Sequence, residues 1–222
     1  MRMKVLYEDS NILAIDKPSG ILVHPDDRSK EKTVFDLFLK KYPKLEIVHR
    51  LDKETSGVLL LAKNKKTHEF LKKQFQDRTI KKTYVAIVSG NVKNDRGVIN
   101  KPIGRSPKDF RRYLAGRGAR GEMRDAITQY RVLKRFEADH FRFSYLEIHP
   151  KTGRTHQIRV HMKYLNHPVV CDSLYNPDNP TPKGITRMAL HAQSIEFKNL
   201  KGDIIKVESP IPKEFEKVIR KN

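Results

Sequence analysis

The sequence has a single cysteine, Cys171, no tryptophan and no long apolar run. One cysteine cannot form an internal disulfide, and a zinc site built on it would need histidine or carboxylate partners at suitable spacing. The longest clean apolar run, Val58 to Ala62, is far shorter than the roughly 20 residues of a membrane-spanning helix. Glu8 and Asp9 interrupt any signal-peptide pattern after the basic start. We therefore expect a cytoplasmic protein that contacts no membrane.

Acidic residues are scarce relative to basic ones. The 222 residues include 46 Lys plus Arg against 26 Asp plus Glu, which leaves a net charge of +20. Such a field attracts polyanions. Charge alone also fits a generally basic protein, or a ribosomal protein with a solvated lysine-rich face, because such a field is not specific to one partner; the choice therefore depends on the motifs.

Apolar periodicity predicts a mixture of strands and helices in one domain, residues 1–222, because no repeat, low-complexity tract or linker divides the chain. Strands are expected at Val5–Tyr7, Ile12–Asp16, Ile47–Leu51, Val58–Ala62, Thr83–Ser89, Ile127–Leu133 and Phe141–Ile148. Helices are expected at Thr33 to about Lys41, Asn64–Gln76 and Thr155–Leu165. Within the last of these helices, Ile158, Met162 and Leu165 form the apolar stripe.

Residues 101–126 form a basic stretch rich in glycine. From Lys101 to Arg131 there are nine lysines and arginines against three acids, with four glycines and two prolines. We expect a long, mobile, basic loop rather than a core element. Gly116 to Gly121 matches the dinucleotide fingerprint G-x-G-x-x-G, but that fingerprint requires a strand before it and a helix after it. The flanking residues predict neither, so we reject it.

Metal-binding patterns are also missing from the sequence. His156 and His161 are five residues apart, which places them about 140° apart on a helix and prevents a shared ligand face. No H-E-x-x-H, paired-cysteine or phosphate-loop motif is present. We expect neither metal nor cofactor, and we expect the histidines to serve in polar packing and phosphate contacts.

Asp52 lies at the mouth of a predicted turn between two apolar strands, with Arg50 two residues earlier and therefore expected on the same strand face. Aspartate often caps local backbone N–H groups in turns. From position alone, Asp52 is either such a cap or a catalytic carboxylate, and the cap is the commoner case.

The surrounding string, His49-Arg50-Leu51-Asp52 followed by Thr55-Ser56-Gly57-Val58-Leu59-Leu60-Leu61, resembles the central motif of RluA-type pseudouridine synthases. Four further blocks resemble the same family in the same order. They are Tyr7-Glu8-Asp9 through Asp16-Lys17-Pro18-Ser19-Gly20 with His24-Pro25, then Lys82 to Ala86, Thr152 to His161, and Leu190-His191-Ala192. The resemblance therefore covers nearly the whole chain.

The resemblance implies an isomerase that breaks the C1′–N1 bond of a uridine in RNA, turns the base and rejoins it through C5. It implies that Asp52 is the catalytic carboxylate, Tyr84 the active-site tyrosine and Arg159 the arginine of the third block. We expect Arg159 to keep Asp52 ionised, and we expect the target uridine to be flipped out of its stack. The expected RNA contacts are Arg50, Leu190, Arg154 and the arginine set, namely Arg105, Arg111, Arg112 and Arg117.

The resemblance further implies an α+β fold, a pseudouridine synthase catalytic domain whose mixed, mostly antiparallel sheet has flanking helices and a basic central cleft. Longer relatives carry a small RNA-binding domain before the catalytic one, whereas this chain begins at the catalytic block, so its loops are expected to choose the target. Relatives often have Gly-Asp where this chain has Cys171-Asp172, and we assign Cys171 no role.

We expect a monomer that acts on stem-loops of ribosomal RNA, transfer RNA or both. A non-catalytic RNA-binding or ribosome-assembly protein on the same scaffold is the alternative, but it would not require Asp52, Tyr84 and Arg159 together. A phosphate-cleaving nuclease would need a cluster of acidic metal ligands, and the sequence offers none.

Overall fold

The computed structural model describes residues 3–25 and 31–221. The chain divides into two compact units, which we call the first unit (Met1–Lys82 with Ala192–Pro210) and the second unit (Thr83–His191 with Ile211–Asn222). Each is an α+β unit in which most strand pairs are antiparallel, in agreement with the mostly antiparallel sheet expected from the sequence. No helix in these described ranges is long and apolar enough to cross a membrane.

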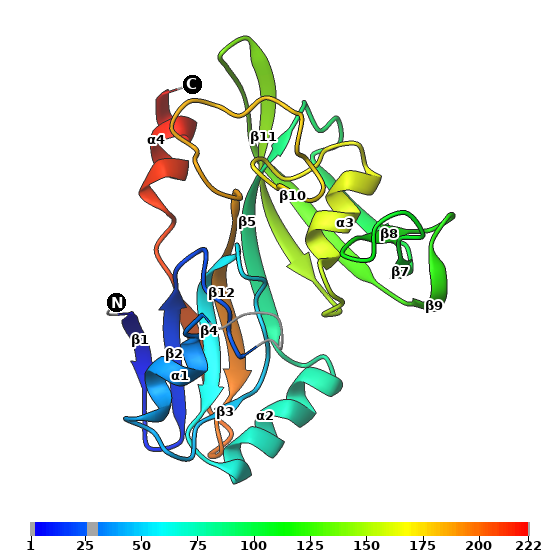
Figure 1. Cartoon of the computed structure of the whole chain (residues 1–222). Helices are drawn as coiled ribbons and strands as arrows, with labels where there is room; N and C mark the ends of the chain where they lie inside the picture. The colour runs from blue at the N-terminus through cyan, green and yellow to red at the C-terminus, as the bar shows by residue number, and fades with distance from the viewer. Residues whose placement is uncertain (1–2, 26–30, 222) are drawn as a thin grey trace. The chain divides into compact units, whose positions relative to one another are not determined.

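The first unit is a sheet with the strand order β1-β2-β4-β12, in which β3 pairs with β4 and β13 pairs with β12 (Figure 1). Its elements are β1 (Lys4–Glu8), β2 (Ile12–Lys17), α1 (Val34–Leu39), β3 (Glu46–Ile47), β4 (Ser56–Ala62), α2 (Lys65–Gln76), the start of β5 (Lys81–Ser89), most of β12 (Leu190–Lys198) and β13 (Ile204–Glu208). Every residue of β4 is buried, so the run Val58 to Ala62 is the centre of this sheet.

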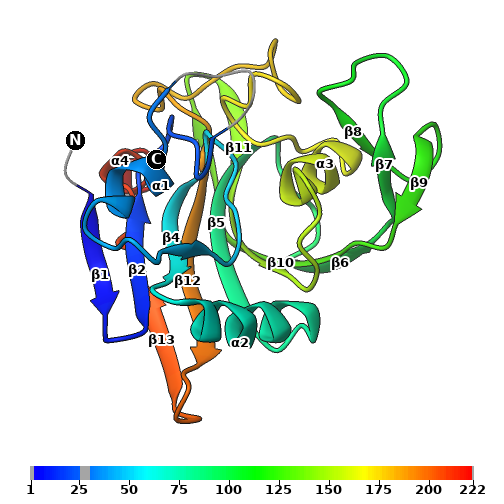
Figure 2. The same cartoon turned by 60° about the horizontal axis from the view of Figure 1, so that its bottom comes forward.

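Both helices predicted for the first unit are present, and each begins at a capping residue within its own segment of the sequence. Thr33 and Asp36 form a reciprocal capping box at the start of α1. The Asn64 side chain accepts a hydrogen bond from the N–H of Thr67 at the start of α2. Leu71 is fully buried, and α2 packs against β3 and β4 (Figure 2).

The second unit contains a long antiparallel sheet, β5-β11-β10-β6, and a three-stranded sheet, β8-β7-β9. Its elements, besides the rest of β5 and the start of β12, are β6 (Arg96–Asn100), β7 (Ile103–Arg105), β8 (Tyr113–Ala115), β9 (Arg120–Arg124), β10 (Ile127–Ala138), β11 (Phe141–Pro150), α3 (Gln157–Tyr164) and α4 (Lys213–Lys221). Along α3, Ile158 and Met162 are buried in the core and Leu165 packs against it, which confirms the predicted stripe.

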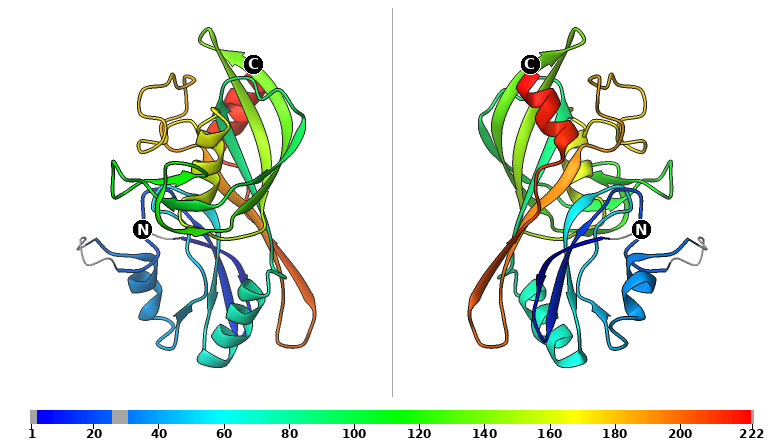
Figure 3. Two further views of the ribbon diagram at one scale, coloured as in Figure 1. Left: turned by 90° about the vertical axis from the view of Figure 1, so that its right-hand side faces the viewer. Right: turned by 90° about the vertical axis from the view of Figure 1, so that its left-hand side faces the viewer.

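The expectation of a loop at residues 101–126 is wrong in part, because three short strands form a sheet there. Ile103 and Ala126 are buried with Val160 of α3 and with Tyr175, and Figure 3 shows this sheet beside α3. The segment is therefore tied to the core by contacts with residues more than 30 positions away, and local composition cannot reveal such contacts.

The predicted strand Ile47–Leu51 is wrong beyond Ile47, since only Glu46 and Ile47 pair with β4. The N–H of Leu60 in β4 donates instead to the His49 ring, at 3.0 Å from Nε2. A side chain thus takes up a strand hydrogen bond, and the backbone leaves the sheet two residues before Arg50. Consequently, Arg50 and Asp52 do not share a strand face.

Candidate active site

The turn that carries Asp52 is anchored in the first unit on both sides. Leu51 before it and Thr55 and Ser56 after it are buried, whereas Asp52 is partly exposed. The N–H of Thr55 donates to the Asp52 carbonyl at 3.1 Å and closes the turn. The carboxylate is therefore presented from a backbone that is fixed immediately around it.

Lys17 connects this turn to a segment 36 residues earlier in the chain. Its side chain is completely buried, and its ammonium donates to the carbonyls of Pro18, Ile21 and Lys53 at 3.0, 2.8 and 2.9 Å. A buried ammonium needs three acceptors to replace its water. Lys17 is thus a structural cation, and one of its acceptors is the carbonyl of Lys53, the residue that follows Asp52.

Two further bonds join the same two segments. The Ser19 hydroxyl donates to the carbonyl of Glu54 at 2.7 Å, and the N–H of Gly20 donates to the carbonyl of Lys53 at 2.9 Å. The segments around Lys17 and Asp52 are therefore joined by several hydrogen bonds, which the sequence did not reveal.

Gly57 is required where β4 approaches β12. Its φ is +109°, and a Cβ at this position would lie 2.2 Å from the carbonyl oxygen of Ala192. Neither the backbone conformation nor the space tolerates a side chain. The glycine of the Thr-Ser-Gly string therefore sets how closely the strand following Asp52 packs in the sheet.

His49 is neutral in this environment. Burial, with Lys82 as a smaller electrostatic cause, lowers its pKa to about 3. Its Nε2 accepts the N–H of Leu60, and its ring stacks on Phe75 with centroids 4.9 Å apart. His49 therefore packs the Asp52 segment against β4 and α2, and a protonated ring could not accept that hydrogen bond.

Arg50 is exposed, and its Nη1 donates to Nε2 of His24 at 2.9 Å. Nδ1 of His24 lies 2.7 Å from the carbonyl of Pro25, so it carries the proton that makes Nε2 the acceptor. The His-Pro pair of the first block thus orients the arginine that precedes Asp52.

Arg159 of α3 lies in the second unit and is buried against Asp172. Its Nε and Nη2 donate to the two carboxylate oxygens at 2.6 and 2.8 Å, and its guanidinium lies 5.1 Å from the ring centre of Tyr175. Asp172 also accepts the N–H groups of Leu174 and Tyr175. Asp172 is a functional candidate that nothing in its own stretch of sequence, next to Cys171, indicates.

The rest of the third block is a buried polar network. Gln157 bonds to Thr152, Ile127 and Thr128, and Thr128 lies 2.8 Å from Nδ1 of His161. Burial lowers the pKa of His161, and its Nε2 lies 3.0 Å from the carbonyl of Lys101. This histidine therefore serves polar packing, which is one of the two uses expected from the sequence.

Three other predicted residues lie in the second unit. Tyr84 is partly exposed on β5, opposite Ile148 of β11. Leu190, at the start of β12, is 3% exposed and belongs to the core. Arg154 donates from Nε to the carbonyl of Asp125 at 2.9 Å. This bond joins the block Thr152 to His161 to the basic stretch at residues 101–126.

The arginine set is held by the small sheet. Arg105 is on β7 with its guanidinium over the Tyr113 ring, and Arg117 is exposed between β8 and β9. Arg111 and Arg112 both pair with Asp109, whose pKa these contacts lower to about 2, with Arg111 as the main cause. Asp109, one of the three acids of this stretch, therefore offsets part of the charge of Arg111 and Arg112.

Among the residues that the structure describes, no group of three or more His, Cys, Asp or Glu side chains could hold a metal ion. The candidate reactive groups are the partly exposed carboxylate of Asp52 in the first unit, and Tyr84 and the buried Arg159 in the second unit.

Comparison with known proteins gives a consistent result. Residues 11–164 match the family model described as RNA pseudouridylate synthase. The chain is 40% identical over 222 residues to the ribosomal large subunit pseudouridine synthase D of Borreliella burgdorferi, covering 95% of this chain and 66% of that protein. It is 37% identical over 235 residues to the protein of the same name from Xanthomonas campestris, covering 98% and 68%. It also resembles the solved structure of human RNA Pseudouridylate Synthase Domain Containing 1, with a TM-score of 0.79 and 27% identity over 94% of this chain and 83% of that one. The chain thus spans about two thirds of the length of the two bacterial relatives.

Proposed function

The chain belongs to the RNA pseudouridylate synthase family, and from this premise we propose that it converts uridine in RNA to pseudouridine with Asp52 as the catalytic carboxylate. The observation that carries the proposal is the Asp52 turn, where a partly exposed carboxylate stands on a backbone fixed by Lys17 and Ser19. Ordinary capping aspartates need no such support from a buried ammonium 35 residues away.

The reaction is an isomerisation that balances within the nucleotide. The C1′–N1 bond breaks, the base turns, a C1′–C5 bond forms, and the proton lost from C5 is matched by one gained at N1. Its chemistry requires an ionised carboxylate close to the sugar and base, and it involves no oxidation and no phosphate transfer. We accordingly propose that the protein works without a metal or cofactor.

Arg159 is the proposed cation that keeps Asp52 ionised, and Tyr84 the proposed stacking surface for the flipped uracil. The support for Arg159 is its place in the third block and its fixed, buried head group. The Tyr84 hydroxyl is the proposed aid to proton removal at C5.

The remaining expected residues are proposed to bind RNA. Arg50 fills the space that the flipped base leaves or grips the flanking phosphate, and Leu190 lines the pocket. Arg154 and the arginine set contact the backbone. Because two of the similar bacterial proteins are named for the large ribosomal subunit, ribosomal RNA is the first proposed substrate, with transfer RNA stem-loops as the second. We further propose a cytoplasmic monomer whose catalytic domain extends over residues 1–222.

Mapping pseudouridine in cellular RNA tests this function. Total RNA is compared from cells that lack the gene, cells complemented with the wild type and cells complemented with Asp77→Asn, a control at an exposed position on the C-cap of α2. One or more pseudouridines should disappear with the gene and return with both complements. Unchanged maps in all strains, for ribosomal and transfer RNA alike, would contradict the proposal.

A further inference from the structure

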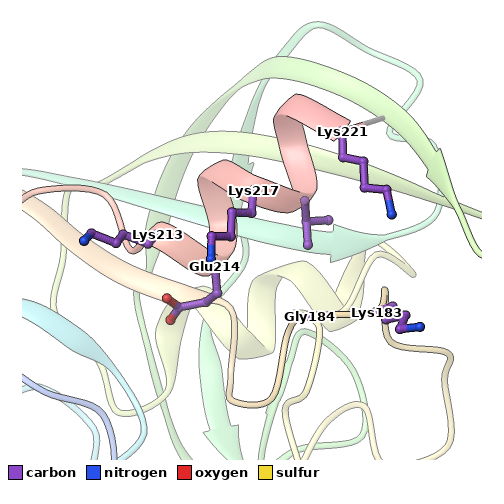
Figure 4. Close-up of a pocket in the computed structure, with 7 residues that line it drawn as sticks. Lys183, Gly184, Lys213, Glu214, Lys217 and Lys221 are labelled. Atoms are coloured by element: carbon purple, nitrogen blue, oxygen red, sulfur yellow. The ribbon is translucent and has the colours of Figure 1, made fainter.

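The C-terminal helix α4 and the turn at residues 182–185 line a half-open cavity of about 390 Å³ in the second unit (Figure 4). Four lysines line it together with Gly184, Glu214 and Val218. The lysine row is Lys213, Lys217 and Lys221 on one face of α4 together with Lys183 on the facing turn. None of these residues takes part in the reaction proposed above.

The helix that carries the lysine row is fixed in place. Phe215 on its opposite face and Val218 beside the row are 0% and 5% exposed and belong to the core. Near its C-terminus, the Lys134 ammonium donates to the carbonyl of Ile219 at 2.7 Å. The helix that presents the row is therefore packed into the core as far as Ile219.

The turn that carries Lys183 is equally constrained. The N–H of Lys183 donates to the Asp139 carboxylate at 2.8 Å, and the N–H of Ile185 donates to the carbonyl of Pro182 at 3.1 Å. Ile185 is 4% exposed and anchors the turn in the core. In Figure 4, Lys183 and Lys221 lie at one end of the cavity and Lys213 at the other.

The charge of the row is not balanced locally. Glu214, the acid of the lining, is bonded to Arg187 at 2.8 Å. Within the part of the chain that the structure describes, none of the four lysines lies within ion-pair distance of a carboxylate. Like charges spaced i, i+4 destabilise a helix by about 0.2–0.5 kcal/mol per pair, and Lys213 opposes the dipole at the N-terminal end. The arrangement therefore costs stability, and a bound polyanion would offset that cost.

The spacing of the row suits a chain of phosphates better than a single anion. Lysines four residues apart on a helix are separated by about 6 Å along its axis, which is similar to the step between neighbouring phosphates of one strand. Lysine binds phosphate as a flexible point charge without demanding a particular base. We propose that the lysine row is a track for the backbone phosphates of the RNA substrate, an inference that rests on the proposed function.

Salt-dependent binding tests the track. The row variant changes Lys183, Lys213, Lys217 and Lys221 to Gln. The matched control changes four exposed lysines of another helix, α2, to Gln: Lys65, Lys66, Lys72 and Lys73. Binding of a ribosomal RNA stem-loop to the two variants and the wild type is measured from 0.05 to 0.5 M salt.

Each lost phosphate contact flattens the plot of log affinity against log salt by about 0.7–0.9, so the row variant should lose about 3 from the slope. If the lines meet near 1 M salt, the loss at 0.1 M is up to about 1,000-fold. The control should lose much less, and a row variant with Arg in place of all four lysines should retain the wild-type slope. The melting temperature of the Gln variant should equal or exceed that of the wild type, because repulsions are removed.

Equal losses in the row variant and the control would show only a general effect of net charge and would overturn the track. Lines parallel to the wild type with equal affinity would overturn it as well. RNA binding, and tritium release from RNA labelled at uridine C5, are measured on the same protein preparations. Wild-type protein that binds RNA but releases no tritium refutes the proposed function, while the comparison of slopes still decides the track.

Discussion

The pair Arg159–Asp172 offers the sharpest prediction on stability and reaction together. The Arg159 side chain is 7% exposed and that of Asp172 0%, so Asp172→Asn leaves a cation in the interior without its counter-charge. Removing one partner of a buried ion pair costs about 3–5 kcal/mol. For a chain of this size, each kcal/mol shifts the melting temperature by about 2–4 °C, so the variant should melt about 6–20 °C lower.

The double variant Arg159→Met with Asp172→Asn separates structure from reaction. It removes the buried charge, while the Asn oxygen can still accept the N–H groups of Leu174 and Tyr175, now bonded to Oδ1 of Asp172. Replacing both charges by uncharged groups is often neutral or stabilising, so most of the lost stability should return. Loss of the stacking on Tyr175 should leave a deficit of about 0.5–2 kcal/mol.

Thermal and urea unfolding followed by circular dichroism measure the stabilities, and tritium release measures activity. We expect the double variant to be folded and inactive, because Arg159 is proposed to act on Asp52. A double variant as unstable as Asp172→Asn would refute the reasoning on buried charge. Full activity of the double variant would refute the role given to Arg159.

Three further predictions concern Lys17, His49 and the arginine set. Lys17→Met should destabilise the protein by about 2 kcal/mol or more in urea unfolding, because the carbonyls of Pro18 and Ile21 lose the ammonium donor and that of Lys53 keeps only the N–H of Gly20; a loss below 1 kcal/mol would contradict the structural role given to Lys17. Burial lowers the pKa of His49 from 6.5 to about 3, so stability should be full above pH 6.5 and fall towards pH 4 by up to about 1.4 kcal/mol per unit; His49→Gln should flatten this fall, and the exposed control His140→Gln should not. Changing the arginine set to Gln should reduce the salt slope of RNA binding by about 3 if all four contact phosphates, and the rate at saturating RNA should fall much less than the affinity; an unchanged slope and affinity would exclude these contacts.

The sequence predicted those elements whose causes are local. The helix after Asn64 was predictable because its cap and its apolar side chains lie within one short segment, and the strand Val58 to Ala62 was predictable from its apolar run. Asp52 could be picked out from its motif, because Thr55, Ser56 and Gly57 follow it at the family spacing.

What escaped prediction depends on contacts between distant residues. The ammonium of Lys17 reaches Lys53 across 36 residues, and nothing near Lys17 marks it as buried. Asp172 meets Arg159 only because the chain returns to α3 after that helix ends. The strands of the basic segment exist because Ile103 and Ala126 find Val160 and Tyr175, while their polar neighbours suggest a loop.

Tritium release by wild type and Asp52→Asn tests the central claim most directly. RNA labelled at uridine C5 loses tritium only when that carbon exchanges its hydrogen, and the substitution keeps the shape of the side chain while removing its negative charge. Both proteins should bind the RNA with similar affinity, the wild type should release tritium, and Asp52→Asn should release none above background. Substantial release by Asp52→Asn would contradict the assignment of Asp52 as the catalytic carboxylate.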